Sequence, residues 1–140
     1  MSVGIGSLSQ KTVGRRSMNA IELASELVAL RFRCNDEKEL QGGVFGALTG
    51  FEIPFIAEYP LTPHERVDFY IPVGGIGIEV KTNDSRGGAG LSAVTRQLWR
   101  YAKSDEIKAL ILITTRSKHR ELPNEILGKP LLVVYLNSFL

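Results

Sequence analysis

Three ionisable side chains lie at the ends of two neighbouring apolar segments of this sequence. Asp68 ends the first segment, and Glu79 and Lys81 flank Val80 at the end of the second. Residues two apart in a strand share one face, so we expect Glu79 and Lys81 to project together. If the two segments pair as a hairpin, Asp68 comes alongside Glu79. Two converging carboxylates favour a hard cation such as Mg²⁺. A metal with an ammonium group beside it suits hydrolysis of a phosphodiester.

The spacing of these residues resembles the motif of the PD-(D/E)XK nuclease superfamily, which is an Asp, a short spacer and Glu-x-Lys on a strand. The proline of that motif is absent here, because Val67 precedes Asp68. The resemblance implies that Asp68, Glu79 and the carbonyl of Val80 bind Mg²⁺, for which Mn²⁺ substitutes. It also implies that Lys81 orients or activates the attacking water and stabilises the charge of the transition state.

A second part of the resemblance lies on the helix expected after the Lys81 strand. Gln97 and Tyr101 are four residues apart and share a helix face. They are similar to a Gln-x-x-x-Tyr element that supports the active site or the substrate end in many relatives. The alternative is that Tyr101 belongs to the apolar face of this helix and Gln97 borders it. The preceding Gly-rich segment contains Asn83 and Arg86, which are candidates for contacts with phosphates.

The third acidic residue of the expected metal site has two candidates, Glu37 and Glu39. Both lie in a segment that resembles the first-helix segment of these nucleases, where a glutamate completes the metal site. We expect Glu39 to take this role, with Glu37 as the alternative. The spacing Asp36-x-x-Glu39 is also that of a helix capping box, which would explain Glu39 without any metal.

Hydrophobic periodicity predicts an α/β fold with a mixed central sheet flanked by helices. Helices are expected after the capping signals at Asn19 and Asp36, the first of them ending near Asn35, and from Leu91 to Ala102. Strands are expected at Phe51–Ala57, Arg66–Ile71, Ile76–Lys81, Ala109–Thr115 and Leu131–Leu136, with a loop at Tyr59–Glu65. This order resembles the αβββαβ core of restriction-endonuclease-like folds, with an extra N-terminal helix.

The first residues differ in composition from the rest of the chain. Residues 1–16 are basic and rich in Gly and Ser, which is typical of a flexible arm. Such an arm either contacts a phosphate backbone or is a plain disordered terminus. We expect residues 17–140 to form a single nuclease domain.

The composition excludes several other kinds of protein. The chain has 140 residues, a formal charge of +2 and a single cysteine, Cys34. One cysteine supports neither a disulfide framework nor a four-Cys iron–sulfur cluster, and with His64 and His119 it offers too few ligands for a zinc site. The sequence has no apolar run long enough to span a membrane and no signal peptide. We therefore expect a cytoplasmic protein with no membrane contact and no small-molecule cofactor.

These observations favour a Mg²⁺-dependent deoxyribonuclease. In size and layout the chain resembles the Holliday-junction resolvases of the superfamily, which implies structure-specific cleavage of DNA by a homodimer in recombination or repair. The Gln97 and Tyr101 element points instead to the exonuclease branch, and a restriction-type endonuclease is a further alternative. A DNA-binding module that keeps the fold without catalysis is the alternative from another class. Trp99 is either an exposed stacking or interface residue or a packed one.

Overall fold

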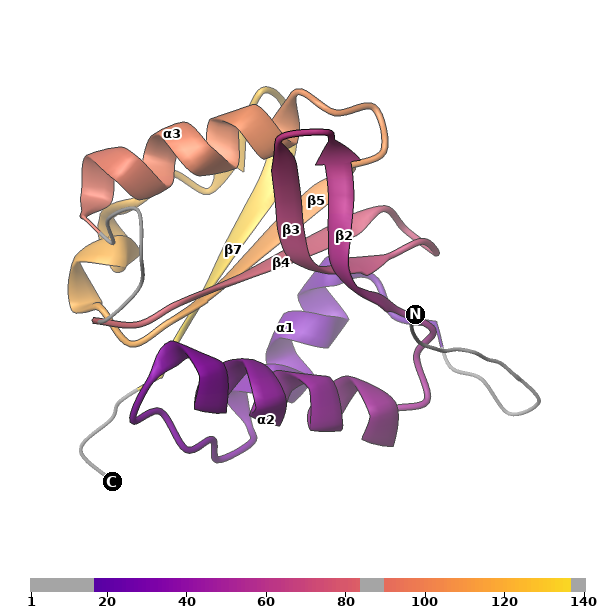
Figure 1. Ribbon diagram of the computed structural model, residues 1–140, viewed down its shortest axis with the longest axis vertical. Helices are drawn as coiled ribbons and strands as arrows, with labels where there is room; N and C mark the ends of the chain where they lie inside the picture. The colour runs from indigo at the N-terminus through magenta and orange to yellow at the C-terminus, as the bar shows by residue number, and fades with distance from the viewer. Residues whose placement is uncertain (1–16, 84–89, 137–140) are drawn as a thin grey trace.

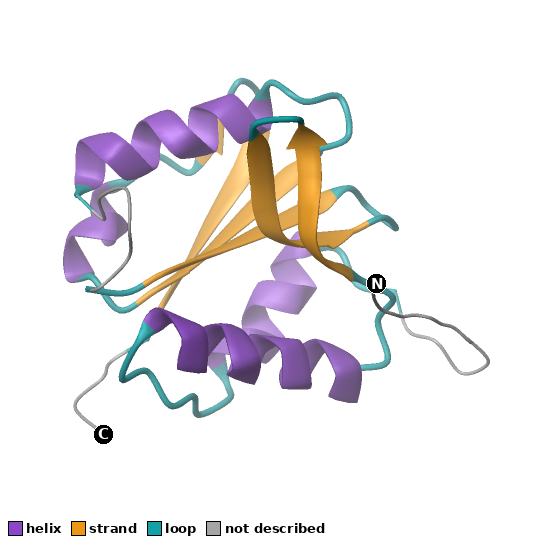
Figure 2. Cartoon of the chain, viewed as in Figure 1, coloured by secondary structure: helices purple, strands orange, loops and turns teal. Residues whose placement is uncertain are grey.

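A computed structural model of the chain describes residues 17–83 and 90–136. In these residues a mixed six-stranded sheet has the order β2-β3-β4-β5-β7-β6, with helices on both of its faces (Figures 1 and 2). The expected α/β class is therefore confirmed. The basic arm at residues 1–16 and Arg86 lie outside the described residues, as do residues 137–140.

The first two helices begin where the capping signals of the sequence predict. Helix α1 (Ala20–Val28) has a complete capping box, in which Asn19 Oδ1 accepts the N–H of Glu22 and Glu22 Oε1 accepts the N–H of Asn19. Helix α2 (Glu37–Gly50) is capped by Asp36, and helix α3 (Leu91–Ala102) begins after Gly90.

Helix α1 is shorter than the sequence predicts. It ends at Val28 rather than near Asn35. Phe32 continues the helical spacing of apolar residues, but it lies in the non-helical segment that follows and packs against α2. A Cβ atom at Gly43 would lie only 2.9 Å from Phe32 Cδ1. The ring of Phe32 is therefore partly buried by contact with another helix. Its helical spacing from the apolar residues of α1 does not mean that it belongs to α1.

The strands that carry the expected site agree closely with the prediction. Strands β3 (Glu65–Ile71) and β4 (Ile76–Lys81) are antiparallel, and β4 is parallel to β5 (Ala109–Thr114). Every residue of β4 and β5 is buried, as expected for central strands covered on both faces. Three further elements complete this part of the chain: the 3₁₀ helix η1 (Ser117–Glu121), β6 (Glu125–Ile126) and β7 (Lys129–Tyr135).

The first strand of the sheet corrects the prediction. Strand β2 covers Ile56–Thr62 and pairs with β3 through residues that were expected to form a loop, including Pro60 opposite Arg66. A proline is tolerated there because β2 is the edge strand, where one side of the backbone needs no partner. The positive φ of Glu58, 56°, and a register shift after Pro60 make this strand irregular, which hides its pattern in the sequence.

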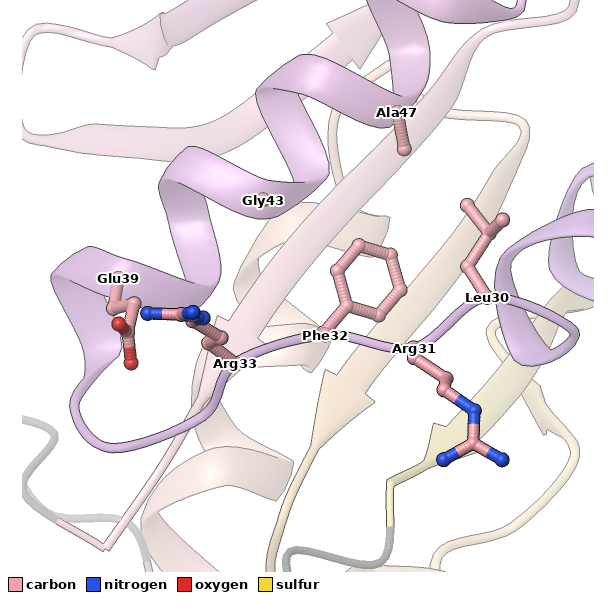
Figure 3. Close-up of a pocket in the computed structure, with 7 residues that line it drawn as sticks. All are labelled: Leu30, Arg31, Phe32, Arg33, Glu39, Gly43 and Ala47. Carbon is pink, nitrogen blue, oxygen red and sulfur yellow. The ribbon is translucent and has the colours of Figure 1, made fainter. Parts of the chain in front are cut away.

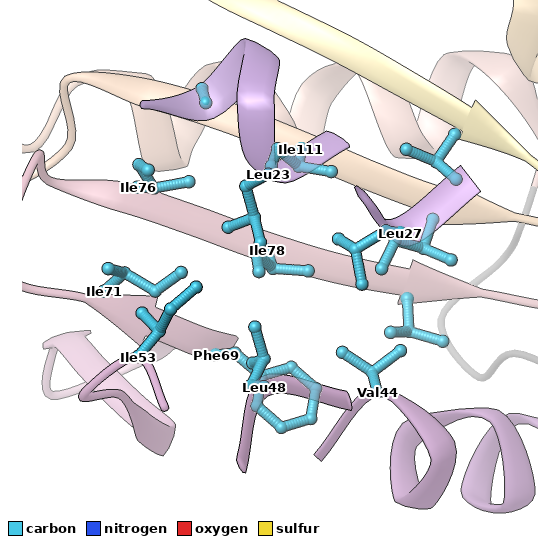
Figure 4. Close-up of a cluster of buried hydrophobic side chains, with 14 of the residues drawn as sticks. Leu23, Leu27, Val44, Leu48, Ile53, Phe69, Ile71, Ile76, Ile78 and Ile111 are labelled. Carbon is cyan, nitrogen blue, oxygen red and sulfur yellow. The ribbon is translucent and has the colours of Figure 1, made fainter. Parts of the chain in front are cut away.

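Two hydrophobic clusters hold the layers together. The larger one joins α1 and α2 to one face of the sheet, with residues such as Leu23, Leu48 and Ile78 (Figure 4). The smaller one joins α3 to the opposite face through Leu98 and Leu110. In the part of the chain that the structure describes, no helix is both long and apolar enough to cross a membrane.

Candidate active site

The site lies at a fork between β3 and β4. The last backbone pair of these strands is Phe69 with Ile78, so the regular ladder stops just before Asp68 and Glu79 would pair. Val67 packs in the cluster under α3, whereas Phe69 packs in the cluster under α1 and α2. In a regular strand these two residues would share a face. Strand β3 therefore changes face at Asp68, and Figure 1 shows the β2–β3 hairpin bending away from β4.

The side chains of Asp68 and Glu79 take over the hydrogen bonds of the interrupted ladder. Asp68 Oδ2 accepts the N–H of Val80 at 2.8 Å, and Glu79 Oε1 accepts the N–H of Asp68 at 3.4 Å. Lys81 Nζ lies 3.2 Å from Glu79 Oε2, and the side chains of this ion pair are only 5% and 4% exposed. The structure thus brings Asp68, Glu79 and Lys81 together, as the spacing of the motif predicts.

The carbonyl of Val80 faces the same fork. The N–H of Val80 points to the β3 side, where it meets Asp68. In a strand the N–H and C=O of one residue point to the same neighbour. The next carbonyl along the chain, that of Lys81, accepts the N–H of Thr115 on the β5 side, which agrees with this alternation. Oxygen donors of three residues, Asp68, Glu79 and Val80, therefore converge at the fork.

Burial makes both carboxyl groups hold their protons more tightly. The pKa of Glu79 is raised from 4.5 to about 8, mainly by burial and then by the charge of Asp68, although Lys81 lowers it. The pKa of Asp68 is raised from 3.8 to about 6, again mainly by burial, while its bond from the N–H of Val80 opposes the shift. One ammonium group thus faces two carboxyls, a buried one at Glu79 and a half-buried one at Asp68, and a divalent cation in place of the proton would stabilise the charged pair.

Helix α3 closes the fork on one side through Tyr101 and Gln97. The hydroxyl of Tyr101 lies 2.7 Å from the carbonyl of Arg66 on β3 and 3.1 Å from Glu79 Oε1 on β4, so it bridges the two strands where they separate. Gln97 Nε2 donates to the same hydroxyl at 2.9 Å. Burial and the neighbouring carboxylates raise the pKa of Tyr101, so this hydroxyl keeps its proton. Tyr101 therefore contacts Glu79 directly, and Gln97 acts on it through the Tyr101 hydroxyl.

Helix α2 closes the other side, and it does so through Glu37 rather than Glu39. The charge of Glu37 raises the pKa of Asp68, and a hydrogen bond from the Gln41 side chain lowers it. Gln41 Nε2 also donates to Glu37 Oε2 at 3.1 Å. Glu37 and Gln41 are four residues apart, so one face of α2 presents both to Asp68.

This geometry favours Glu37, the alternative, over Glu39 as the third acidic residue. Glu39 Oε1 accepts the N–H of Asn35 at 3.1 Å, and Asp36 Oδ1 accepts the N–H of Glu39 at 2.7 Å. The side chain lines a separate surface hollow of about 450 Å³ beside Arg33 and Phe32 (Figure 3). Glu39 therefore stabilises the start of α2, whereas Glu37 is the glutamate whose charge acts on Asp68.

The donor set at the fork suits a hard cation. All its donors are oxygen atoms, which Mg²⁺ and Mn²⁺ prefer. Across residues 17–83 and 90–136, no group of three His, Cys, Asp or Glu side chains is close enough to form a metal site without other donors. Two carboxylates and a main-chain carbonyl are therefore the donors that this part of the chain offers, with Glu37 beside them.

Other expected contacts have mixed outcomes. Asn83 is exposed and its Oδ1 accepts a hydrogen bond from Arg116 Nη1 at 3.3 Å, whereas Arg86 lies outside the described residues. Trp99 is 43% exposed, with Lys103 Nζ at 4.7 Å from its ring centroid, so the packed alternative for Trp99 is wrong. The role of Gln41 was missed, although its position four residues after Glu37 would have pointed to it.

Comparison of the chain with protein-family models, with curated proteins and with solved structures finds no match. The resemblance to the PD-(D/E)XK nucleases accordingly depends on the motif residues and on how the fold arranges them.

Proposed function

We propose that this chain is a Mg²⁺-dependent nuclease that hydrolyses phosphodiester bonds of DNA. The observation that carries the proposal is the pair of the half-buried Asp68 and the buried Glu79 at the fork, with Lys81 at 3.2 Å from Glu79. A purely structural ion pair would balance its charges, because an unpaired buried charge is strongly destabilising. Here two carboxyls face one ammonium, and both have raised pKa values. Such an arrangement is typical of a functional site.

Each residue then has a definite part in the chemistry. Asp68, Glu79 and the carbonyl of Val80 would hold the cation. A bound Mg²⁺ supplies Lewis-acid activation of the phosphate and a lowered pKa for the attacking water. Lys81 places a positive charge and three N–H donors beside the reacting phosphate, where negative charge grows in the transition state. Tyr101 and Gln97 keep the Glu79 carboxylate in position.

The order of elements supports the finer assignment of the fold. Helix α2, strands β2, β3 and β4, helix α3 and strand β5 follow one another as in the αβββαβ core of restriction-endonuclease-like folds, and α1 is the extra N-terminal helix. The motif residues lie on the second and third strands and on the helix that follows, where the resemblance requires them.

Of the possible nucleases, we favour a homodimeric, structure-specific endonuclease that cuts four-way DNA junctions. Two sites related by a two-fold axis would cut two strands symmetrically. Helix α1 offers a surface for the contact, because Ile21 and Val28, seven residues apart, are 67% and 56% exposed. Trp99 offers another.

A substrate panel with light scattering tests this form of the proposal. With Mg²⁺, the wild-type protein is expected to be a dimer and to cut a four-way junction faster than linear duplex, single strand or nicked plasmid. Ile21→Glu should give monomers that lose paired cuts if α1 forms the interface, whereas the control Ile56→Glu, on the edge strand, should remain a dimer. If the wild-type protein is a monomer that degrades linear DNA from its ends, the protein is an exonuclease and the junction-cutting assignment is wrong.

A DNA-binding module without catalysis is the second candidate, and one observation favours it. Both carboxylate oxygens of Glu79 already accept protein donors, from Tyr101 and the N–H of Asp68 on one side and from Lys81 on the other. A cation must then share or displace these contacts. Tight DNA binding by the wild-type protein with no cleavage in Mg²⁺ or Mn²⁺ would establish this candidate and overturn the nuclease.

The two glutamates at the start of α2 give a matched pair of variants. Glu37→Gln should slow cleavage about tenfold or more. Glu37 faces Asp68, and its negative charge acts on the Asp68 carboxyl that would bind the metal. Glu39→Gln should leave the rate unchanged, because Gln still serves in a capping position. Cleavage rates and thermal unfolding of both variants check this. A large loss of activity in Glu39→Gln alone would reverse the assignment.

A further inference from the structure

A second group of polar side chains lies where the carboxyl ends of β4 and β5 meet. Lys81 at the end of β4 is paired in parallel register with Thr114 at the end of β5, and the carbonyl of Lys81 accepts the N–H of Thr115 at 3.2 Å. After Thr115 the chain leaves the sheet and enters η1. The backbone of Arg116 therefore lies close to the end of β4, the strand that carries Glu79 and Lys81.

A buried hydrogen bond fixes the turn that carries Arg116. Thr114 Oγ1 and His119 Nδ1 are 2.6 Å apart, and both residues are fully buried. Thr114 Oγ1 also accepts the N–H of Arg116 at 3.0 Å, and the carbonyl of Arg116 accepts the N–H of His119 at 3.1 Å. Both main-chain groups of Arg116 are thus held, so its side chain leaves the turn in a defined direction.

The guanidinium of Arg116 is only partly satisfied within the described residues. Its Nη1 donates to Asn83 Oδ1 at 3.3 Å, but its buried Nε has no hydrogen-bond partner there. The salt bridges of the same residues pair other cations, Arg66, Lys81, Arg100 and Lys118, with carboxylates. A buried N–H without an acceptor is destabilising. A planar guanidinium with open donors matches the oxygens of a phosphate group.

We propose that Arg116 binds a backbone phosphate of the DNA beside the Asp68–Glu79 centre, and that Thr114 and His119 are positioning residues for it. This inference rests on the proposed nuclease function, since it names a cation besides Lys81 that contacts the substrate next to that centre. Asn83 holds the guanidinium near the end of β4 before DNA arrives. Because Arg116 is partly exposed, the phosphate approaches the terminal N–H donors of its guanidinium rather than the buried Nε.

DNA binding measured at several salt concentrations tests the proposal. The parent is the full chain carrying Glu79→Gln, so that a fluorescein-labelled four-way junction and a duplex stay intact during anisotropy titrations. Adding Arg116→Gln should weaken binding to both probes and reduce the slope of log affinity against log salt by about 1, the effect of one lost phosphate contact. Adding Arg120→Gln, in the same turn, removes an equal charge, but this side chain stacks on Tyr135 and should change the slope little.

The test of the positioning residues uses the salt dependence of DNA binding, which a loss of stability alone would not change. Adding Thr114→Val keeps every charge but removes the hydroxyl that holds Arg116 and His119, so the salt slope should fall as in Arg116→Gln. Adding Thr114→Ser keeps the hydroxyl and should restore the slope. Thermal unfolding of each variant shows that binding is measured on folded protein.

The outcomes separate this inference from the nuclease proposal. Cleavage of the junction by the wild-type chain in Mg²⁺ is measured in parallel. If the wild-type chain cleaves DNA and the Arg116→Gln and Arg120→Gln slopes are equal, Arg116 makes no specific contact and only the inference is overturned. The same holds if Arg116→Gln lowers thermal stability with an unchanged slope. If the parent binds no DNA and the wild-type chain cleaves none, both proposals fall.

Discussion

Replacing Glu79 with glutamine is expected to reduce Mg²⁺-dependent cleavage about a thousandfold, to near the background rate. Glutamine keeps the shape of the side chain and can still meet Lys81 and Tyr101, but it removes one of the two carboxylates at the fork. Asp68→Asn should have an effect of the same order, because it removes the other. Cleavage of a labelled four-way junction, followed on a gel under single-turnover conditions, measures both.

A matched control separates the site from general effects of lost charge. Glu58→Gln removes a carboxylate from the same sheet, but Glu58 is 64% exposed and pairs with Arg66 across 3.7 Å on the edge hairpin. Its cleavage rate should equal that of the wild-type chain. Full activity in both Glu79→Gln and Asp68→Asn would remove these residues from any catalytic role.

The second large effect concerns stability against pH in the absence of metal. The pKa values of Asp68 and Glu79 in the folded chain, about 6 and about 8, lie above their ordinary values of 3.8 and 4.5. Between about pH 4 and pH 8 the folded chain therefore binds more protons than the unfolded chain. The free energy of unfolding must then fall as pH rises through this window, by several kcal/mol, since a pKa raised by 1 corresponds to about 1.4 kcal/mol.

Chemical denaturation from pH 5 to pH 9 in EDTA measures this loss. Glu79→Gln should flatten the profile and be more stable than the wild-type chain at pH 9, because no buried carboxylate has to form at position 79. Saturating Mn²⁺ should flatten the wild-type profile as well, since a bound cation takes the place of the proton. Superimposable profiles for the wild-type chain and Glu79→Gln would show that Glu79 is not the buried group that loses its proton in this range.

The central strands were predictable from the sequence because their signals are local. Ile76–Lys81 is an apolar run bounded by a Gly-rich turn and a polar loop, and its bounds agree with β4. The apolar run from Ala109 matches β5 to within one residue. The Glu-x-Lys spacing then places Glu79 and Lys81 on one face for geometric reasons alone.

The remaining features depend on contacts between distant parts of the chain. Whether Glu37 or Glu39 meets Asp68 is decided by the rotation of α2 against a strand about thirty residues away, and successive helix residues differ by about 100° in direction. Likewise, the edge position that lets Pro60 lie in a strand exists only once the sheet has formed. The partnership of Thr114 with His119 also appears only when η1 folds back over the end of β5.

Direct measurement of Mn²⁺ binding at pH 7.5 is the sharpest test of the fork as a metal site. In calorimetric titrations the wild-type chain and Glu39→Gln should bind Mn²⁺ with the same affinity, and Asp68→Asn and Glu79→Gln should bind it at least tenfold more weakly. Equal binding by all four proteins would place the metal elsewhere. Cleavage of DNA by a wild-type chain that binds no Mn²⁺ or Mg²⁺ would contradict the metal-dependent nuclease altogether.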